Sequence, residues 1–106
     1  MKTIRYDKLV RDYIPDIISA AGKTCVVEVL SDEEYLRRVD QKLDEELAEY
    51  HADQSVEELA DLLEVVYAAA EARGCSREEL ERIRADKAAK RGAFAKKLLL
   101  REVTEP

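Results

Sequence analysis

The sequence is poor in the residues that several common kinds of functional site require. It has no tryptophan and one histidine, His51, so a histidine-based catalytic pair has no support. Its two cysteines, Cys25 and Cys75, match no zinc-binding spacing and are expected to be free thiols. The three glycines stand apart from one another, which excludes a glycine-rich phosphate loop. No apolar run approaches the roughly 20 residues that span a bilayer, so no membrane partner is expected.

Charged residues are abundant instead. Of 106 residues, 40% are charged and 46% are hydrophobic, and there are only three glycines and two prolines. This composition predicts one mainly helical domain spanning residues 1–106. A chain of this length builds only a modest core, so self-association would help its stability. The first residues form no apolar signal region, from which we expect a cytoplasmic protein.

The charges are segregated along the chain. Residues 31–79 carry 16 acids and five bases, whereas residues 80–106 carry eight bases and four acids. The formal net charge of −6 disfavours an extended nucleic-acid partner, because binding one requires a surplus of cations. The acidic middle is either a solvated face or a metal site beside a basic helix that binds an anion.

Serine followed three residues later by glutamate marks the starts of three long helices. These capping boxes are Ser31 with Glu34, Ser55 with Glu58, and Ser76 with Glu79. The apolar spacing then predicts helices over residues 32–51, 56–73 and 77–91, which we expect to form an antiparallel bundle. The second of these is apolar almost all round and is expected to be the most buried.

Two shorter elements complete the predicted fold. Pro15 and Gly22 bound a short helix over residues 15–21. Residues 24–30 are rich in β-branched side chains and are predicted to form a strand. A strand needs a partner, and the C-terminal segment 97–103 is the other segment that can supply one. We therefore expect a small two-stranded sheet that brings the chain ends together.

Two pairs of acids stand at helical spacing on neighbouring helices. Glu46 and Glu49 lie three residues apart on the first long helix. Glu58 and Asp61 repeat this spacing on the second, and the short link over residues 52–54 would bring the two pairs face to face. Four carboxylates without imidazole or thiolate suit Mg²⁺ or Mn²⁺. Such a site favours hydrolysis of phosphoryl bonds by a water that the metal activates.

Most of these acids also have a purely structural interpretation. Glu45 would face solvent. Glu46 would pair with Lys42 one turn away, and Glu58 belongs to a capping box. Asp61 has no comparable explanation, because its neighbours on both sides are leucine and alanine. Since burying an unpaired carboxylate is costly, we expect a cation or strong hydrogen-bond donors near Asp61.

The order of these motifs resembles one enzyme family over nearly the whole chain. Glu-Glu-x-x-Glu followed by Glu-x-x-Asp on the next helix is similar to the all-α nucleoside triphosphate pyrophosphohydrolases of the MazG-like superfamily. More closely, the chain resembles the small phosphoribosyl-ATP pyrophosphohydrolase-like branch. The motifs that carry this resemblance are Tyr6-Asp7-Lys8-Leu9-Val10-Arg11-Asp12, Ile14-Pro15, Leu30-Ser31-Asp32-Glu33-Glu34-Tyr35, Glu57-Glu58-Leu59-Ala60-Asp61 and Arg91-Gly92-x-Phe94.

The resemblance implies a reaction and a set of site residues. The reaction is Mg²⁺-dependent cleavage between the α and β phosphates of a nucleoside triphosphate, giving a nucleoside monophosphate and pyrophosphate, in an enzyme expected to be a homodimer. The implied metal ligands are Glu46, Glu49, Glu58 and Asp61. Glu45 and Glu46 would be the catalytic carboxylates, with Glu45 orienting water. The cations implied to bind substrate phosphates are Lys87, Lys90 and Arg91 near the end of the last helix, and Lys8 and Arg11 near the N-terminus.

Two other interpretations of function stay open. The domain could be a non-catalytic helical interaction module whose acidic face binds a basic partner. Within the enzyme class, a phosphoribosyl-ATP pyrophosphatase of histidine biosynthesis would carry the same residues. For Lys8 and Arg11, an interface role or pairing with Asp12 and Asp7 competes with phosphate binding.

Overall fold

The computed structural model describes residues 2–106, and the regular elements within that range are all helices. The four helices are α1 (Ile14–Ala20), α2 (Asp32–Asp53), α3 (Val56–Ala72) and α4 (Arg77–Arg91). The predicted helices begin and end within two residues of these bounds. The prediction of a mainly helical fold is therefore confirmed. No helix in the described range is long and apolar enough to cross a membrane.

Serine caps determine where the three long helices begin. The side-chain oxygens of Ser31, Ser55 and Ser76 accept hydrogen bonds from backbone N–H groups three residues further on, at 3.2, 3.2 and 3.1 Å. These bonds are the serine half of each predicted capping box and satisfy N–H groups that have no partner inside the helix. The helix starts are predictable because the bonds are local in sequence.

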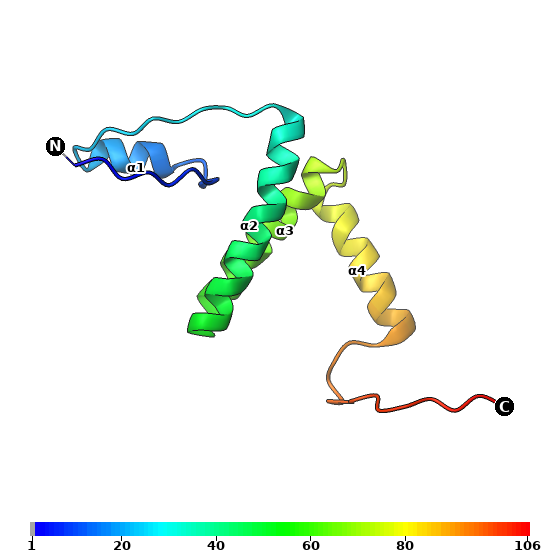
Figure 1. The fold of residues 1–106 in the computed structure, drawn as a ribbon. Coiled ribbons are helices and arrows are strands. Elements are labelled where there is room, and N and C mark those ends of the chain that lie inside the picture. Colours follow the sequence, from blue (N-terminus) through cyan, green and yellow to red (C-terminus); the bar gives the residue numbers. More distant parts are fainter. Residues whose placement is uncertain (1) are drawn as a thin grey trace.

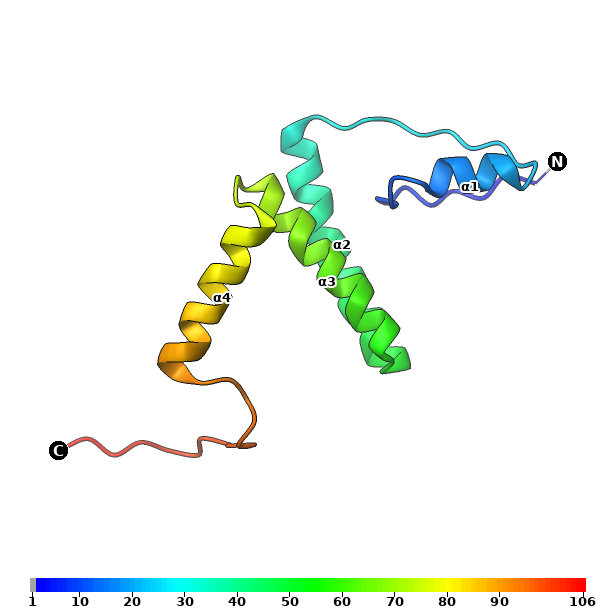
Figure 2. The same cartoon turned by 180° about the vertical axis from the view of Figure 1, so that it is seen from behind.

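α2 and α3 form the principal packed pair of the molecule. They run antiparallel and lie side by side in both views (Figures 1 and 2). Gln54 and Ser55 link them, and Gln54 has a left-handed backbone (φ 55°) that ends α2 and reverses the chain. Val39 of α2, which is 1% exposed, is the one fully buried apolar side chain among residues 2–106. We call this helix pair the α2–α3 hairpin.

The other two helices do not join the hairpin in a bundle. α4 contacts α3 alone among the helices and diverges from the hairpin (Figure 1). α1 packs against none of the other helices. Of the predicted antiparallel bundle, therefore, only the α2–α3 pair is fully formed, because the turn between Ala72 and Arg77 directs α4 away from it.

The predicted two-stranded sheet is wrong. Residues 24–30 and 97–103 are extended, but neither forms a strand, and no backbone hydrogen bond joins them within the described chain. The first segment connects α1 to α2, whereas the second lies beyond α4 at the other end of the molecule (Figure 1). Strand pairing requires a neighbour about 4.8 Å away. Without one, Val26 and Val29 are 98% and 100% exposed.

Little of the protomer's surface is covered by its own chain. The radius of gyration is 18.7 Å, whereas a compact chain of this length has about 13 Å. The accessible surface is 9901 Å², whereas a compact monomer of this mass exposes roughly 6000 Å². A larger share of α3 than of α2 is at least half-buried, as expected, but the two buried side chains, Val39 and Glu46, both belong to α2.

We expect Ser55→Ala to lower the free energy of unfolding by about 1 kcal/mol, because it removes the hydroxyl that caps α3. Urea denaturation at constant protein concentration, followed by far-UV circular dichroism, measures the change. Ser19→Ala, an exposed position inside α1, is the control and should change the free energy of unfolding much less. Equal effects of the two substitutions would contradict the role of the cap.

Candidate metal centre

Carboxylates from α2 and α3 converge on the α2–α3 hairpin. Side-chain oxygens of Glu45, Glu46 and Glu49 lie within 4.8 Å of one another. Oxygens of Glu46, Glu58 and Asp61 do so as well. Glu46 belongs to both groups and so joins the acids of the two helices. The hairpin therefore brings the four carboxylates expected to be metal ligands into two groups that share Glu46.

Glu46 is the buried centre of this cluster. It is 7% exposed, and its Oε2 atom has no hydrogen-bond partner. Its Oε1 atom lies 3.5 Å from Lys42 Nζ, the pairing expected from their four-residue spacing. Burial first, and then the neighbouring charge of Glu49, raise the pKa of Glu46 above its ordinary value. Lys42 thus compensates the negative charge of the Glu46 carboxylate only in part.

Glu58 is in a similar situation on the opposite helix. Its backbone N–H is used in the α3 cap, but its side-chain Oε2 is buried without a hydrogen-bond partner. Burial, followed by the charges of Glu49 and Asp61, raises the pKa of Glu58. The capping box therefore does not account for this carboxylate, which faces the other acids.

Asp61 has the strong donor that its apolar sequence neighbours led us to expect. Arg11 Nη2 donates a hydrogen bond to Asp61 Oδ1 at 2.7 Å, although the two residues are 50 positions apart. Arg11 Nη1 also lies 4.0 Å from Glu64 Oε1. The guanidinium therefore comes from the segment before α1, residues 2–13, which we call the N-terminal arm.

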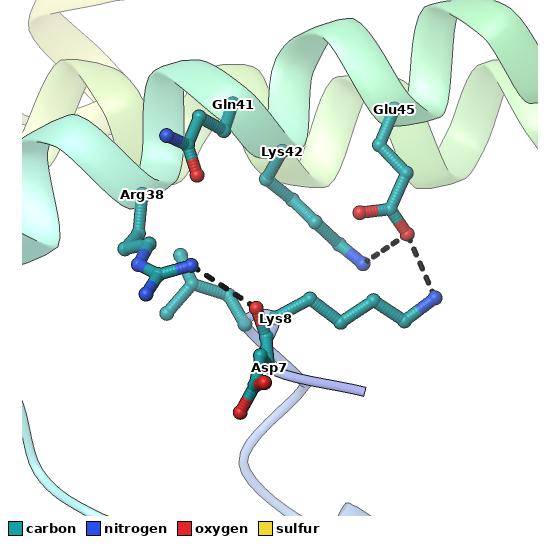
Figure 3. A pocket seen from close by; sticks show the side chains of 7 residues that line it. Asp7, Lys8, Arg38, Gln41, Lys42 and Glu45 are labelled. Carbon is teal, nitrogen blue, oxygen red and sulfur yellow. Dashed lines mark hydrogen bonds and ion pairs between the residues drawn. The ribbon is translucent and has the colours of Figure 1, made fainter. Parts of the chain in front are cut away.

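Lys8 of the same arm reaches the acids of α2. Its Nζ donates to Glu45 Oε1 at 3.0 Å, and Lys42 Nζ donates to the same oxygen at 3.1 Å (Figure 3). Although burial acts in the opposite direction, these two hydrogen bonds lower the pKa of Glu45. The hydrogen bond to Glu45 and the charge of Glu45 raise the pKa of Lys8. Glu45 is consequently held as a carboxylate and Lys8 as an ammonium.

The N-terminal arm and the hairpin enclose an open cleft of about 1140 Å³. Glu46 and Asp61 line it together with Arg11 and Lys42. A smaller pocket of about 40 Å³ lies beside Lys8, Lys42 and Glu45 (Figure 3). Glu46 and Asp61 are thus accessible to a ligand from the cleft, where both signs of charge are present.

The cations expected near the end of the last helix lie elsewhere. Lys87, Lys90 and Arg91 are exposed on α4, which diverges from the hairpin and contacts α3 alone (Figure 2). Within one protomer, the structure therefore does not bring these three cations to the acids. The two cations that do reach the acids, Lys8 and Arg11, pair with Glu45 and Asp61 rather than with Asp7 and Asp12.

Sequence reasoning missed two contributors to this region. Arg38 of α2 donates from Nη1 to the backbone carbonyl of Asp7 at 3.0 Å and so holds the arm in place (Figure 3). Nothing in the sequence pattern indicated this contact. Glu64 could have been found, because it continues the three-residue spacing from Glu58 through Asp61 on the same face of α3.

The donor set fits a hard divalent cation. All converging groups are carboxylates, the ligands that Mg²⁺ and Mn²⁺ prefer. Two of their oxygens, Glu46 Oε2 and Glu58 Oε2, are buried and unpaired, which is unfavourable for a carboxylate unless a cation compensates it. We therefore treat this cluster as a candidate metal centre.

Comparisons with known proteins add a sequence relationship without a function. No family model matches the chain, and no solved structure matches it. An uncharacterized protein of Mycolicibacterium smegmatis is 56% identical over 45 residues, which make up 42% of this chain and 46% of that protein. The chain thus spans about half the length of the curated relative that it matches. Function has to be argued from the site itself.

We expect Glu46→Gln to stabilise the protein in EDTA at neutral pH. Because the pKa of Glu46 is raised in the folded protein, the folded state binds this proton more tightly than the unfolded chain does. The free energy of unfolding then falls as pH rises from the pKa of Glu46 in the unfolded chain through its higher pKa in the folded protein. The amide removes this penalty, so the Tm should rise by a few degrees at about pH 7.5 and not at about pH 4.

The control for this prediction is Asp44→Asn, the same chemical change at an exposed position of α2. It should leave the Tm nearly unchanged at both pH values. Differential scanning calorimetry measures all three proteins. A lower Tm for Glu46→Gln in EDTA at neutral pH would mean that the charged carboxylate stabilises the fold.

Proposed function

We propose that this protein is a Mg²⁺-dependent nucleoside triphosphate pyrophosphohydrolase. It adds water across the bond between the α and β phosphates and releases a nucleoside monophosphate and pyrophosphate. The observation that carries this proposal is the buried Glu46, which has one oxygen without a hydrogen-bond partner and whose carboxylate lies beside those of Glu58 and Asp61. The likeness of the motifs to the MazG-like pyrophosphohydrolases agrees with it.

The chain's own residues have distinct roles in this proposal. Glu46, Glu49, Glu58 and Asp61 hold the divalent cation. When bound, the cation neutralises phosphate charge and lowers the pKa of a water molecule. Glu45, kept ionised by Lys8 and Lys42, accepts a hydrogen bond from the attacking water and so orients it. Arg11 lines the cleft and Lys8 lines the smaller pocket beside Glu45, and phosphate oxygens would lie against these two cations.

The main alternative is a non-catalytic module whose acidic face binds a basic partner. A docking face of this kind needs acids that are exposed to the partner. Glu46 is 7% exposed and Glu58 has a buried oxygen, so the innermost acids are poorly placed for a protein surface to reach. A small cation entering from the cleft can reach Glu46, which lines it, and this favours the metal-dependent enzyme.

We expect the purified protein with millimolar Mg²⁺ to release pyrophosphate from at least one member of a substrate panel. The panel comprises the common nucleoside and deoxynucleoside triphosphates and phosphoribosyl-ATP, which also separates the biosynthetic alternative from a general triphosphatase. Because Asp61 belongs to the cation's ligands, Asp61→Asn should lower kcat/KM by at least about 100-fold. Coupled detection of pyrophosphate measures the rates.

Asp44→Asn is the matched control and should retain the wild-type rate, since Asp44 is exposed on α2 and belongs to neither group of converging carboxylates. Release of orthophosphate instead of pyrophosphate would place the cleavage at a different bond. A folded protein that turns over no member of the panel would contradict the proposal.

The exposed apolar surface supports assembly as a homodimer. Leu59, Leu63 and Val66 lie at four- and three-residue steps on one face of α3, and none of them lines the cleft. Leu59 and Leu63 are 43% and 48% exposed. The roughly 3900 Å² of surface beyond that of a compact monomer exceeds the roughly 800 Å² per partner that a stable interface covers. A second copy could also supply the α4 cations that do not reach the acids within one protomer.

We expect light scattering coupled to size-exclusion chromatography to give twice the protomer mass of 12.1 kDa. Leu63→Glu should dissociate the dimer, because it places a charge in the apolar face of α3. Ala48→Glu adds the same charge at an exposed position of α2 and should leave the dimer intact. A wild-type protein of monomer mass at micromolar concentration would contradict the dimer.

A further inference from the structure

The N-terminal arm contacts both helices of the hairpin at carboxylates of the acid cluster. Lys8 bonds Glu45 of α2 at 3.0 Å, and Arg11 bonds Asp61 of α3 at 2.7 Å. A third bond, from Arg38 Nη1 to the carbonyl of Asp7 at 3.0 Å, ties the start of this segment to α2 (Figure 3). The arm is therefore held beside the candidate metal centre by polar contacts.

These three contacts differ in their relation to the candidate metal centre. Arg38 binds a backbone carbonyl and involves none of the clustered carboxylates. Lys8 binds Glu45, which lies outside the group formed by Glu46, Glu58 and Asp61. Arg11 alone binds a carboxylate of that group. A cation that recruits Asp61 therefore competes with Arg11 and leaves the anchor at Arg38 untouched.

The Arg11–Asp61 pair is suited to exchange. Its side chains are 57% and 43% exposed, and exposed ion pairs of this kind contribute little net stability. The arm also does not neutralise the cluster, because Glu46 Oε2 and Glu58 Oε2 keep no partner beside it. Glu46, Glu58 and Asp61 each offer one oxygen within 4.8 Å of the others, a set that a divalent cation can approach, whereas the guanidinium pairs with Asp61 and Glu64.

We propose that Arg11 is a displaceable counter-ion of the metal centre and that a divalent cation takes its place at Asp61. The guanidinium that is released stays near the cleft, because the Asp7 carbonyl remains bound to Arg38, and it becomes free to bind a phosphate oxygen. Metal loading would thus prepare the anion-binding group of the same site. This inference rests on the metal centre of the proposed function.

The exchange of Arg11 for a cation can be measured through cation affinity, without any enzymatic turnover. If Arg11 competes with the cation for Asp61, removing its charge must strengthen cation binding. We expect Arg11→Gln to bind Mn²⁺ about fivefold more tightly than wild type at low ionic strength, and the difference to shrink at about 0.5 M KCl because exposed pairs are screened. Electron paramagnetic resonance of free Mn²⁺ measures the affinity.

Arg5→Gln is the matched control, since Arg5 is an exposed cation of the same arm six residues before Arg11. It should leave Mn²⁺ affinity close to wild type. If Arg11 merely stabilised the fold, its replacement would weaken Mn²⁺ binding or leave it unchanged. Either result, or equal gains in Arg11→Gln and Arg5→Gln, would overturn the proposal.

A second measurement keeps the arm intact. The protein has no tryptophan, so Tyr13→Trp places a single reporter two residues after Arg11 at a position that is 76% exposed. Saturating Mg²⁺ should lower the fluorescence anisotropy of this tryptophan as Arg11 leaves Asp61. The same addition should have no effect in the Asp61→Asn background. An anisotropy that does not respond to Mg²⁺ overturns the exchange.

These measurements separate the inference from the function on which it rests. Absence of Mn²⁺ binding in wild type and in Arg11→Gln would remove the metal centre and both proposals together. If Mn²⁺ affinity does not depend on Arg11 but the protein releases pyrophosphate, the counter-ion proposal alone is overturned and the proposed function stands. Tighter Mn²⁺ binding by Arg11→Gln without any turnover would support the counter-ion and count against the enzyme.

Discussion

Repulsion among the carboxylates of the α2–α3 hairpin is the constraint on which the rest of the structure depends. Ser55 and Gln54 turn the chain so tightly that the acids of the two helices must face one another. The apolar packing that opposes this repulsion is thin, with Val39 alone fully buried in the described chain. Positive charge has to be supplied, and Lys42 is the source within the hairpin. The N-terminal arm lies where it does because the acids attract Lys8 and Arg11, not because a core holds it.

The hairpin separates two kinds of surface. Asp61 and Glu64 of α3 face the cleft, whereas Leu59 and Leu63 face outward and do not line it. A helix with 3.6 residues per turn can present both surfaces because acids and leucines occupy different angular positions around its axis. A cation and a second protein chain can therefore bind the same helix without competing for the same side chains.

What the sequence predicted well is what depends on neighbours in sequence. Helix starts followed from serine caps, and the convergence of Glu46 with Asp61 followed from i,i+3 spacing and a short link. The predicted sheet and bundle failed because both depend on contacts between distant segments. The direction of α4 is set by a short turn after Ala72, and the hydropathy pattern does not predict that direction. The Arg11–Asp61 bond spans 50 residues, and sequence could indicate only that Asp61 needed some donor.

The proposed assembly and cation binding would both act on one distance, the separation of α2 from α3. The protomer restrains this separation weakly, because so few side chains are buried between its elements. A second copy covering Leu59 and Leu63 would restrict the motion of α3, and with it the distance from Asp61 to Glu46. A cation bound between those carboxylates would restrict the same distance from the other side. Binding free energies that favour one conformation are coupled reciprocally, so each event should strengthen the other although the two surfaces share no residue.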